Sequence, residues 1–166
     1  LGDVYKRQTA HIGKWHVGSR NYEMVPNYLK AAGVVDPESV KVNESWNDTY
    51  YYNKDHQAVS KKLKAEGFEG SVAPKDHPLN NGFDYYFGYN QWESPFYNAT
   101  NIWRNFNHAG LIKDYNTDVF TDEALNFIEQ SLNAAKPFYV QLHYHTVHSP
   151  LKPKAPDKYQ KPFNSG

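Results

Sequence analysis

Residues 13–16 of the chain, Gly-Lys-Trp-His, carry side chains suited to holding an anion. In an extended strand, residues two apart project from the same face, so Lys14 and His16 would face one point while Trp15 packs on the other side. Lysine supplies positive charge and histidine a directed hydrogen bond, a combination that suits sulfate or phosphate. Gly13 and Gly18 leave room for close backbone approach. A solvated lysine beside an unrelated histidine fits the spacing equally well.

Three histidines near the end of the chain form the second group: His143, His145 and His148. They lie at the end of an expected strand and in the loop after it, and ligands of open α/β sheets bind beyond the carboxyl ends of strands. His143 and His145 would share a strand face, and with His148 they could hold zinc, although no HExxH-type motif supports such a site. The alternative is a surface histidine at each position, which we favour for His143.

Composition limits the classes of partner. The 166 residues carry 18 Lys+Arg and 18 Asp+Glu, a formal net charge of +0, which argues against a general nucleic-acid or membrane-surface binder. No run of about 18 apolar residues predicts a membrane span. The absence of cysteine excludes disulfides and thiolate metal sites within these residues and leaves the redox compartment undetermined. Aromatic residues make up 16% of the chain and compensate for scarce aliphatics in the expected core.

The elements that must position these side chains follow from periodicity and from turn residues. We expect a short strand before Gly18, and helices over 26–33 and 58–67, each closed by glycine. A surface excursion is expected over 34–55 and a short strand or tight packing segment over 81–88. Helical spacing from Asp118 to Lys136-Pro137 precedes a buried strand over 138–144. The helix face comprises Phe120, Ala124, Phe127, Ile128 and Ser131. This order predicts an α/β domain with a largely parallel sheet flanked by helices.

Three segments, taken together and in order, resemble the sulfatase family of the alkaline-phosphatase-like superfamily. Residues 9–18 (TAHIGKWHVG) resemble the family's GKWH segment, and residues 77–88 (HPLNNGFDYYFG) its GFD-aromatic stretch. Residues 115–151, which include KPFYVQLHYHTVHSPL, are similar to the helix, strand and loop that present its YHxPHxP-like histidines. The resemblance implies a partial alkaline-phosphatase-like domain. Residues 18–76 match poorly.

The resemblance also implies roles for individual residues. Lys14 falls on the lysine that binds the sulfate group, and His16 on the histidine that hydrogen-bonds the nucleophilic aldehyde hydrate. His148 falls on the histidine that contacts the ester and assists the leaving oxygen, and His145 is its substrate-binding neighbour in the motif. Val147 stands where many members have proline. Such an enzyme, arylsulfatase-like, would hydrolyse a sulfate monoester in a sulfated small molecule or a sulfated carbohydrate.

Two parts of a sulfatase have no counterpart in the sequence. The family makes formylglycine from Cys or Ser in a C/S-x-P/A-x-R motif upstream of GKWH, and binds Ca²⁺ or another divalent cation through Asp and Asn residues. Neither this motif nor those ligands are recognisable here, so we expect no metal site in these residues and an inactive fragment. Residues 1–8 resemble a translated adapter sequence, so we expect a non-native start, with 9–166 a fragment of one catalytic domain. A periplasmic or secreted parent is compatible with the sequence.

Two other functions remain open. A phosphonate or phosphodiester hydrolase of the same superfamily would use the same anion-binding residues. A non-catalytic carbohydrate-binding module would explain the aromatic richness, and it requires exposed, coplanar aromatic rings. Buried aromatics, together with Lys14, His16 and His148 in one place, would favour the enzyme.

Overall fold

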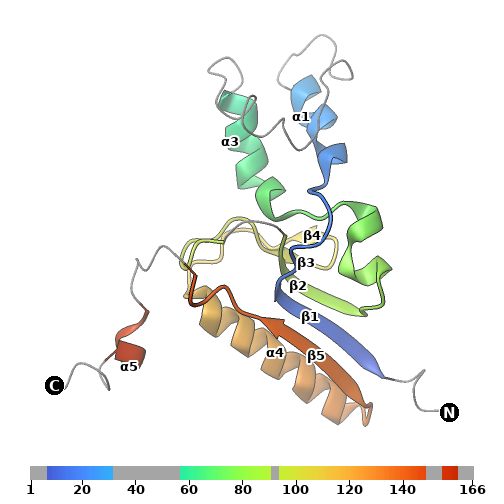
Figure 1. Ribbon diagram of the computed structural model, residues 1–166. Coiled ribbons are helices and arrows are strands. Elements are labelled where there is room, and N and C mark those ends of the chain that lie inside the picture. The colour runs from blue at the N-terminus through green and yellow to red at the C-terminus, as the bar shows by residue number, and fades with distance from the viewer. Residues whose placement is uncertain (1–6, 32–56, 91–93, 149–154, 161–166) are drawn as a thin grey trace.

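A five-stranded sheet forms the centre of the computed structural model, which describes residues 7–31, 57–90, 94–148 and 155–160 (Figure 1). The strand order is β4-β3-β2-β1-β5. β1 is parallel to both β2 and β5, and the short strands β3 and β4 continue the sheet in antiparallel pairing. The strands are β1 (Gln8–Lys14), β2 (Tyr85–Tyr89), β3 (Trp103–Arg104), β4 (Asn107–His108) and β5 (Phe138–His143).

Helix α4 (Asn116–Asn133) lies against one face of this sheet and buries the core (Figure 1). Phe120 and Ala124, one helical turn apart, pack with Ile12 of β1 and Phe87 of β2. Ser131 is also buried, whereas Phe127 and Ile128 are partly buried. The helix face expected from the sequence is therefore the face that contacts the sheet, because residues three and four apart share one side of a helix.

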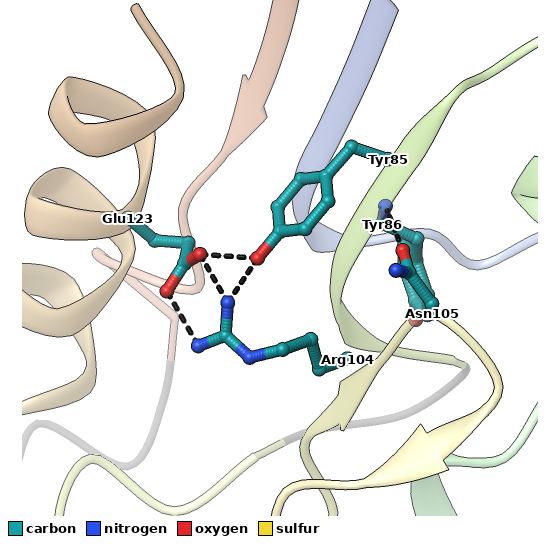
Figure 2. Close-up of polar contacts among 5 residues, drawn as sticks. All are labelled: Tyr85, Tyr86, Arg104, Asn105 and Glu123. Atoms are coloured by element: carbon teal, nitrogen blue, oxygen red, sulfur yellow. Dashed lines mark hydrogen bonds and ion pairs between the residues drawn. The ribbon is translucent and has the colours of Figure 1, made fainter. Parts of the chain in front are cut away.

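A polar cluster joins the same helix to the sheet beside this core (Figure 2). Arg104 of β3 donates to both carboxylate oxygens of Glu123 on α4, with Nη2 2.7 Å from Oε2. The Tyr85 hydroxyl of β2 donates to Glu123 and accepts from Arg104. Burial and the neighbouring carboxylate raise the pKa of Tyr85 well above its ordinary value. Two strands and a helix are thus tied together by one charged pair.

The helices α1 (Val25–Ala31) and α3 (Gln57–Ala65) lie side by side beyond the carboxyl end of β1 (Figure 1). Both were expected from the sequence, and Gly67, with φ of 76°, follows α3 in the left-handed conformation that glycine adopts easily. The expected excursion over 34–55 lies outside the described residues. A short helix, α5 (Asp157–Gln160), completes the described chain.

Two expectations about the end of the chain were wrong in detail. Helix α4 ends at Asn133 rather than at Lys136-Pro137, because Ala135 adopts a left-handed conformation with φ of 51° and stops the helix first. Strand β5 pairs with β1 alone among the described strands and leaves Tyr139 49% exposed, so it is an edge strand and not a buried one. An apolar run does not reveal how many neighbours a strand has.

Candidate active site

The parallel pairing of β2, β1 and β5 brings the carboxyl ends of three strands to one edge of the sheet. Gly13 of β1 pairs with Gly88 on one side and with His143 on the other. Lys14, the last residue of β1, pairs with Tyr89 and is half-buried. The lysine predicted to hold an anion therefore lies where open α/β sheets bind their ligands.

Gly13 is required by the close approach of these strands. Its φ is 100°, and a Cβ built on it would lie 1.9 Å from the carbonyl oxygen of His143. Gly88 is equally restricted, since its Cβ would lie 1.9 Å from the carbonyl oxygen of Gly13. Gly18 has φ of 69°, and its Cβ would meet the Asp76 carboxylate. The expected close backbone approach is confirmed at Gly13, whereas at Gly18 the close neighbour is the Asp76 side chain.

His16 departs from the strand geometry that the spacing predicted. β1 ends at Lys14, and His16 has φ of 52° and is exposed, so the alternation of strand faces does not extend to it. The turn is anchored by Trp15, whose Nε1 donates to the Asp76 carbonyl at 2.9 Å and whose ring packs edge-on against Phe83. Trp15 thus packs as expected, but His16 leaves β1 through a turn rather than along an extended chain.

His145 and His148 lie together in the loop after β5. The His145 ring is 5% exposed; its Nδ1 is 2.9 Å from the Tyr89 hydroxyl, and it also contacts Phe96. The His148 ring stacks on it with 4.9 Å between centroids, and the His148 backbone N–H donates to the His145 carbonyl at 3.0 Å. A buried imidazole held by a tyrosine thus supports an exposed one.

Tyr89 connects the two groups of residues found in the sequence. It pairs with Lys14 in the sheet and hydrogen-bonds His145, on which His148 stacks. The hydrogen bond between Tyr89 and His145 spans 56 residues of sequence, so the two groups lie close together only because of the sheet register. Lys14 and the pair His145–His148 therefore lie at the same carboxyl edge of the sheet. The convergence of Lys14, His16 and His148 on one anion, and contact of His145 with a substrate, stay predictions.

His143 makes different contacts from His145 and His148. Its Nδ1 lies 3.2 Å from the Lys14 carbonyl oxygen, and its ring contacts that of His11 with 5.0 Å between centroids. It does not join His145 and His148 in a three-histidine group. Within the described ranges, no group of three or more His, Cys, Asp or Glu side chains is arranged to hold a metal ion. The site residues named here are therefore a lysine and several histidines.

His11 is a site residue that the sequence analysis missed. It is fully buried in the middle of β1, where Nε2 lies 3.1 Å from the Lys14 carbonyl oxygen and Nδ1 lies 3.3 Å from Gln141 Oε1. Burial is the main cause that lowers its pKa to about 4, and the nearby His143 adds to the effect. The available signal was a histidine inside a short apolar strand, two residues before Gly13.

Comparison with known proteins identifies relatives of the chain. The sequence profile of the Sulfatase family matches residues 1–166. The protein described as uncharacterized sulfatase YdeN of Escherichia coli K12 is 29% identical over 158 residues, which cover 95% of this chain and 23% of that protein. The N-acetylglucosamine-6-O-sulfatase of Bacteroides thetaiotaomicron is 31% identical over 100 residues, 58% of this chain and 18% of that protein. The chain thus spans less than a quarter of the length of these relatives.

A solved structure shows the same fold. The crystal structure of Ps i-CgsB superposes with a TM-score of 0.59 at 18% identity, over 98% of this chain and 28% of that one. This likeness and the largely parallel sheet confirm the expected fold class, a part of an alkaline-phosphatase-like α/β domain. The described residues contain no helix long and apolar enough to span a bilayer. Because the family profile covers its full length, the chain belongs to the sulfatase family.

Proposed function

We propose that this chain is part of a longer sulfatase that hydrolyses a sulfate monoester to sulfate and an alcohol or phenol. Membership of the family supports a sulfuric ester hydrolase, and the length of the relatives supports a longer protein. The observation that carries the proposal is the position of Lys14 and of the pair His145–His148 at the same carboxyl edge of the sheet, joined through Tyr89.

The chemistry of sulfate ester cleavage explains what these side chains would do. The oxygens of the sulfate group need cationic partners, and the Lys14 ammonium at the end of β1 would supply one. The departing alkoxide or phenoxide needs a proton, which the exposed imidazole of His148 would donate. His16, exposed in the turn after β1, would hydrogen-bond the nucleophile, and His145 would border the bound ester below His148.

The nucleophile and the divalent cation must come from other parts of the longer protein. Sulfatases generally use formylglycine and a divalent cation such as Ca²⁺, but this chain contains no cysteine and no recognisable formylglycine motif. The described residues also present no group of acidic or histidine side chains suited to a metal. We therefore assign neither group to this chain and propose that it supplies sulfate-binding and proton-donating residues.

A sulfated carbohydrate or a sulfated small molecule is the proposed substrate. One relative is named as an N-acetylglucosamine-6-O-sulfatase, which supports the carbohydrate class without identifying the sugar. The carbohydrate-binding module is less well supported, because the five largest fully buried side chains of the described residues are all aromatic and fill the core. Those buried aromatics are Tyr86, Tyr89, Phe68, Phe87 and Phe120.

Assays of the longer protein on an aryl sulfate and an aryl phosphonate, side by side, test the proposal. Hydrolysis of the sulfate, lost in Lys14→Ala, is the expected result. Activity on the phosphonate alone would reject the sulfatase assignment in favour of a phosphonate hydrolase with the same anion-binding residues.

A further inference from the structure

One backbone carbonyl at the proposed site receives two imidazoles from different strands. The Lys14 carbonyl oxygen lies 3.1 Å from His11 Nε2 and 3.2 Å from His143 Nδ1. The pairing of β1 with β5 ends one residue earlier, at Gly13 and His143. The two rings therefore hold the Lys14 carbonyl just beyond the last residue pair of that ladder.

The chemistry of the acceptor fixes the protonation of both rings. A carbonyl oxygen has two lone pairs and no proton to give, so His11 must present Nε2–H and His143 must present Nδ1–H. With Nε2 protonated and the ring neutral, Nδ1 of His11 is an acceptor. This tautomer requires the Gln141 amide in the flipped orientation, in which its NH₂ group, and not its Oε1, would donate to Nδ1.

The surroundings of the two rings hold them in place. His11 is wedged between Trp15, at 4.8 Å, and Phe83, at 5.6 Å between centroids, and the His143 ring meets it edge-on. His11 is fully buried and His143 is exposed. One imidazole thus belongs to the core, whereas the other reaches the same carbonyl from the surface.

We propose that His11 and His143 are positioning residues: by donating to the Lys14 carbonyl from two sides, they fix the peptide at the end of β1 and thereby the direction of the Lys14 side chain. This inference rests on the proposed function, in which Lys14 binds the sulfate group. A small error in the placement of a charged group weakens its contact with the substrate, so these two rings act on sulfate through Lys14 and not by touching it.

His143 is the better residue to change, because its exposure makes misfolding a small risk. In the longer protein, His143→Leu removes the donor, whereas His143→Asn keeps an N–H close to the place of Nδ1. We expect His143→Leu to weaken binding of inorganic sulfate and to lower kcat/KM about tenfold, roughly the effect of one lost hydrogen bond, and His143→Asn to restore most of both. For the buried ring, His11→Gln is the variant that keeps a donor near Nε2, and it should likewise retain most of the sulfate binding and of kcat/KM.

A double-mutant cycle separates positioning from a general structural effect. If His143 acts through Lys14, His143→Leu has no further effect on sulfate binding in a Lys14→Ala background. His108→Leu is the matched control, because this ring also bonds a backbone carbonyl, that of Thr100 at 2.8 Å, but from β4 at the other edge of the sheet. Equal losses in both backgrounds, or no loss in either, would overturn the proposal.

Histidine-selective ¹⁵N NMR provides a readout that does not depend on activity. We expect His143 protonated at Nδ1 and His11 at Nε2, each signal assigned by its loss in the corresponding variant. If the longer protein cleaves no sulfate ester, the proposed function fails, but these tautomers still decide whether the two rings hold the carbonyl. An unprotonated Nδ1 on His143 could not donate to the Lys14 carbonyl, and it would overturn the proposal whatever the activity of the protein.

Discussion

Lys14 is half-buried at the end of β1, and its proposed task depends on charge and not on packing. In the longer protein we expect Lys14→Ala to lower kcat/KM for a sulfate ester about a hundredfold or more, since a preorganised cation is lost from the transition state. The free energy of unfolding should change by much less than this loss, on the order of 1 kcal/mol, as is typical of a single substitution. Steady-state kinetics and urea unfolding on the same preparations measure both, and an unchanged rate would contradict the assignment.

His148 is exposed, and its proposed role is to protonate the leaving oxygen. Esters of weakly acidic alcohols need this proton most, so His148→Ala should slow them more than it slows nitrophenyl-type esters. The measurement is the slope of log kcat/KM against the pKa of the leaving group, which should steepen in the variant. Parallel slopes would show that His148 positions the ester instead.

The ends of the parallel strands depend on Gly13 and Gly88, which sequence patterns alone do not distinguish from other glycines in the chain, such as Gly82. Gly13 and Gly82 both have positive φ, 100° and 93°, but only Gly13 has backbone atoms where a Cβ would lie. We expect Gly82→Ala to cost about 1 kcal/mol from backbone strain, and Gly13→Ala to cost about 3 kcal/mol or more because the strands must also separate. Urea unfolding of both variants tests this, and equal losses would contradict the close approach.

Elements were predicted well where one local signal decided them. The face of α4 followed from helical periodicity, and β1 and β2 from short aromatic or apolar runs beside glycine. The end of α4 and the exposure of β5 were not predicted, because neither a left-handed Ala135 nor a strand with one partner among the described strands leaves a local pattern. The turn at His16 was not predicted for the same reason. It is held by the hydrogen bond from Trp15 to the Asp76 carbonyl, a contact between residues distant in sequence.

At the scale of the whole molecule, buried histidines make stability depend on pH. Burial lowers the pKa of His11 from 6.5 to about 4, and it also lowers the pKa of His77. Between the folded pKa of His11, about 4, and its unfolded pKa, 6.5, the unfolded chain binds more protons than the folded chain. The free energy of unfolding therefore rises with pH across this interval and then levels off. The His11 contribution is on the order of 3 kcal/mol.

Urea unfolding followed by tryptophan fluorescence at a series of pH values measures this dependence. His11→Gln should flatten the curve in that interval. A free energy of unfolding that stays constant from about pH 4 to about pH 7 would contradict a neutral, buried His11 ring with its proton on Nε2.

The chain by itself should bind sulfate weakly and hydrolyse no ester, because we assign it neither nucleophile nor divalent cation. The comparison is between the 166-residue chain and the longer protein, assayed with the same aryl sulfate at equal concentration. Turnover by the chain alone that disappears in Lys14→Ala would show that the missing groups are not needed. The relatives, of which the chain covers 23% and 18%, leave ample length for those groups.

The sequence by itself determined the chemistry of the side chains and the local elements that carry them: a strand ending in Lys14, a histidine-rich loop after another strand, and a helix between them. Tertiary structure decided which of these side chains meet. Gln141 and His143 reach His11 and the Lys14 carbonyl across 130 and 129 residues of sequence, and only the register of β5 against β1 sets that contact. Local dihedral preferences and periodicity are encoded within a few residues, whereas register is settled by packing of the complete sheet, so the contacts of His11 were visible only in the folded chain.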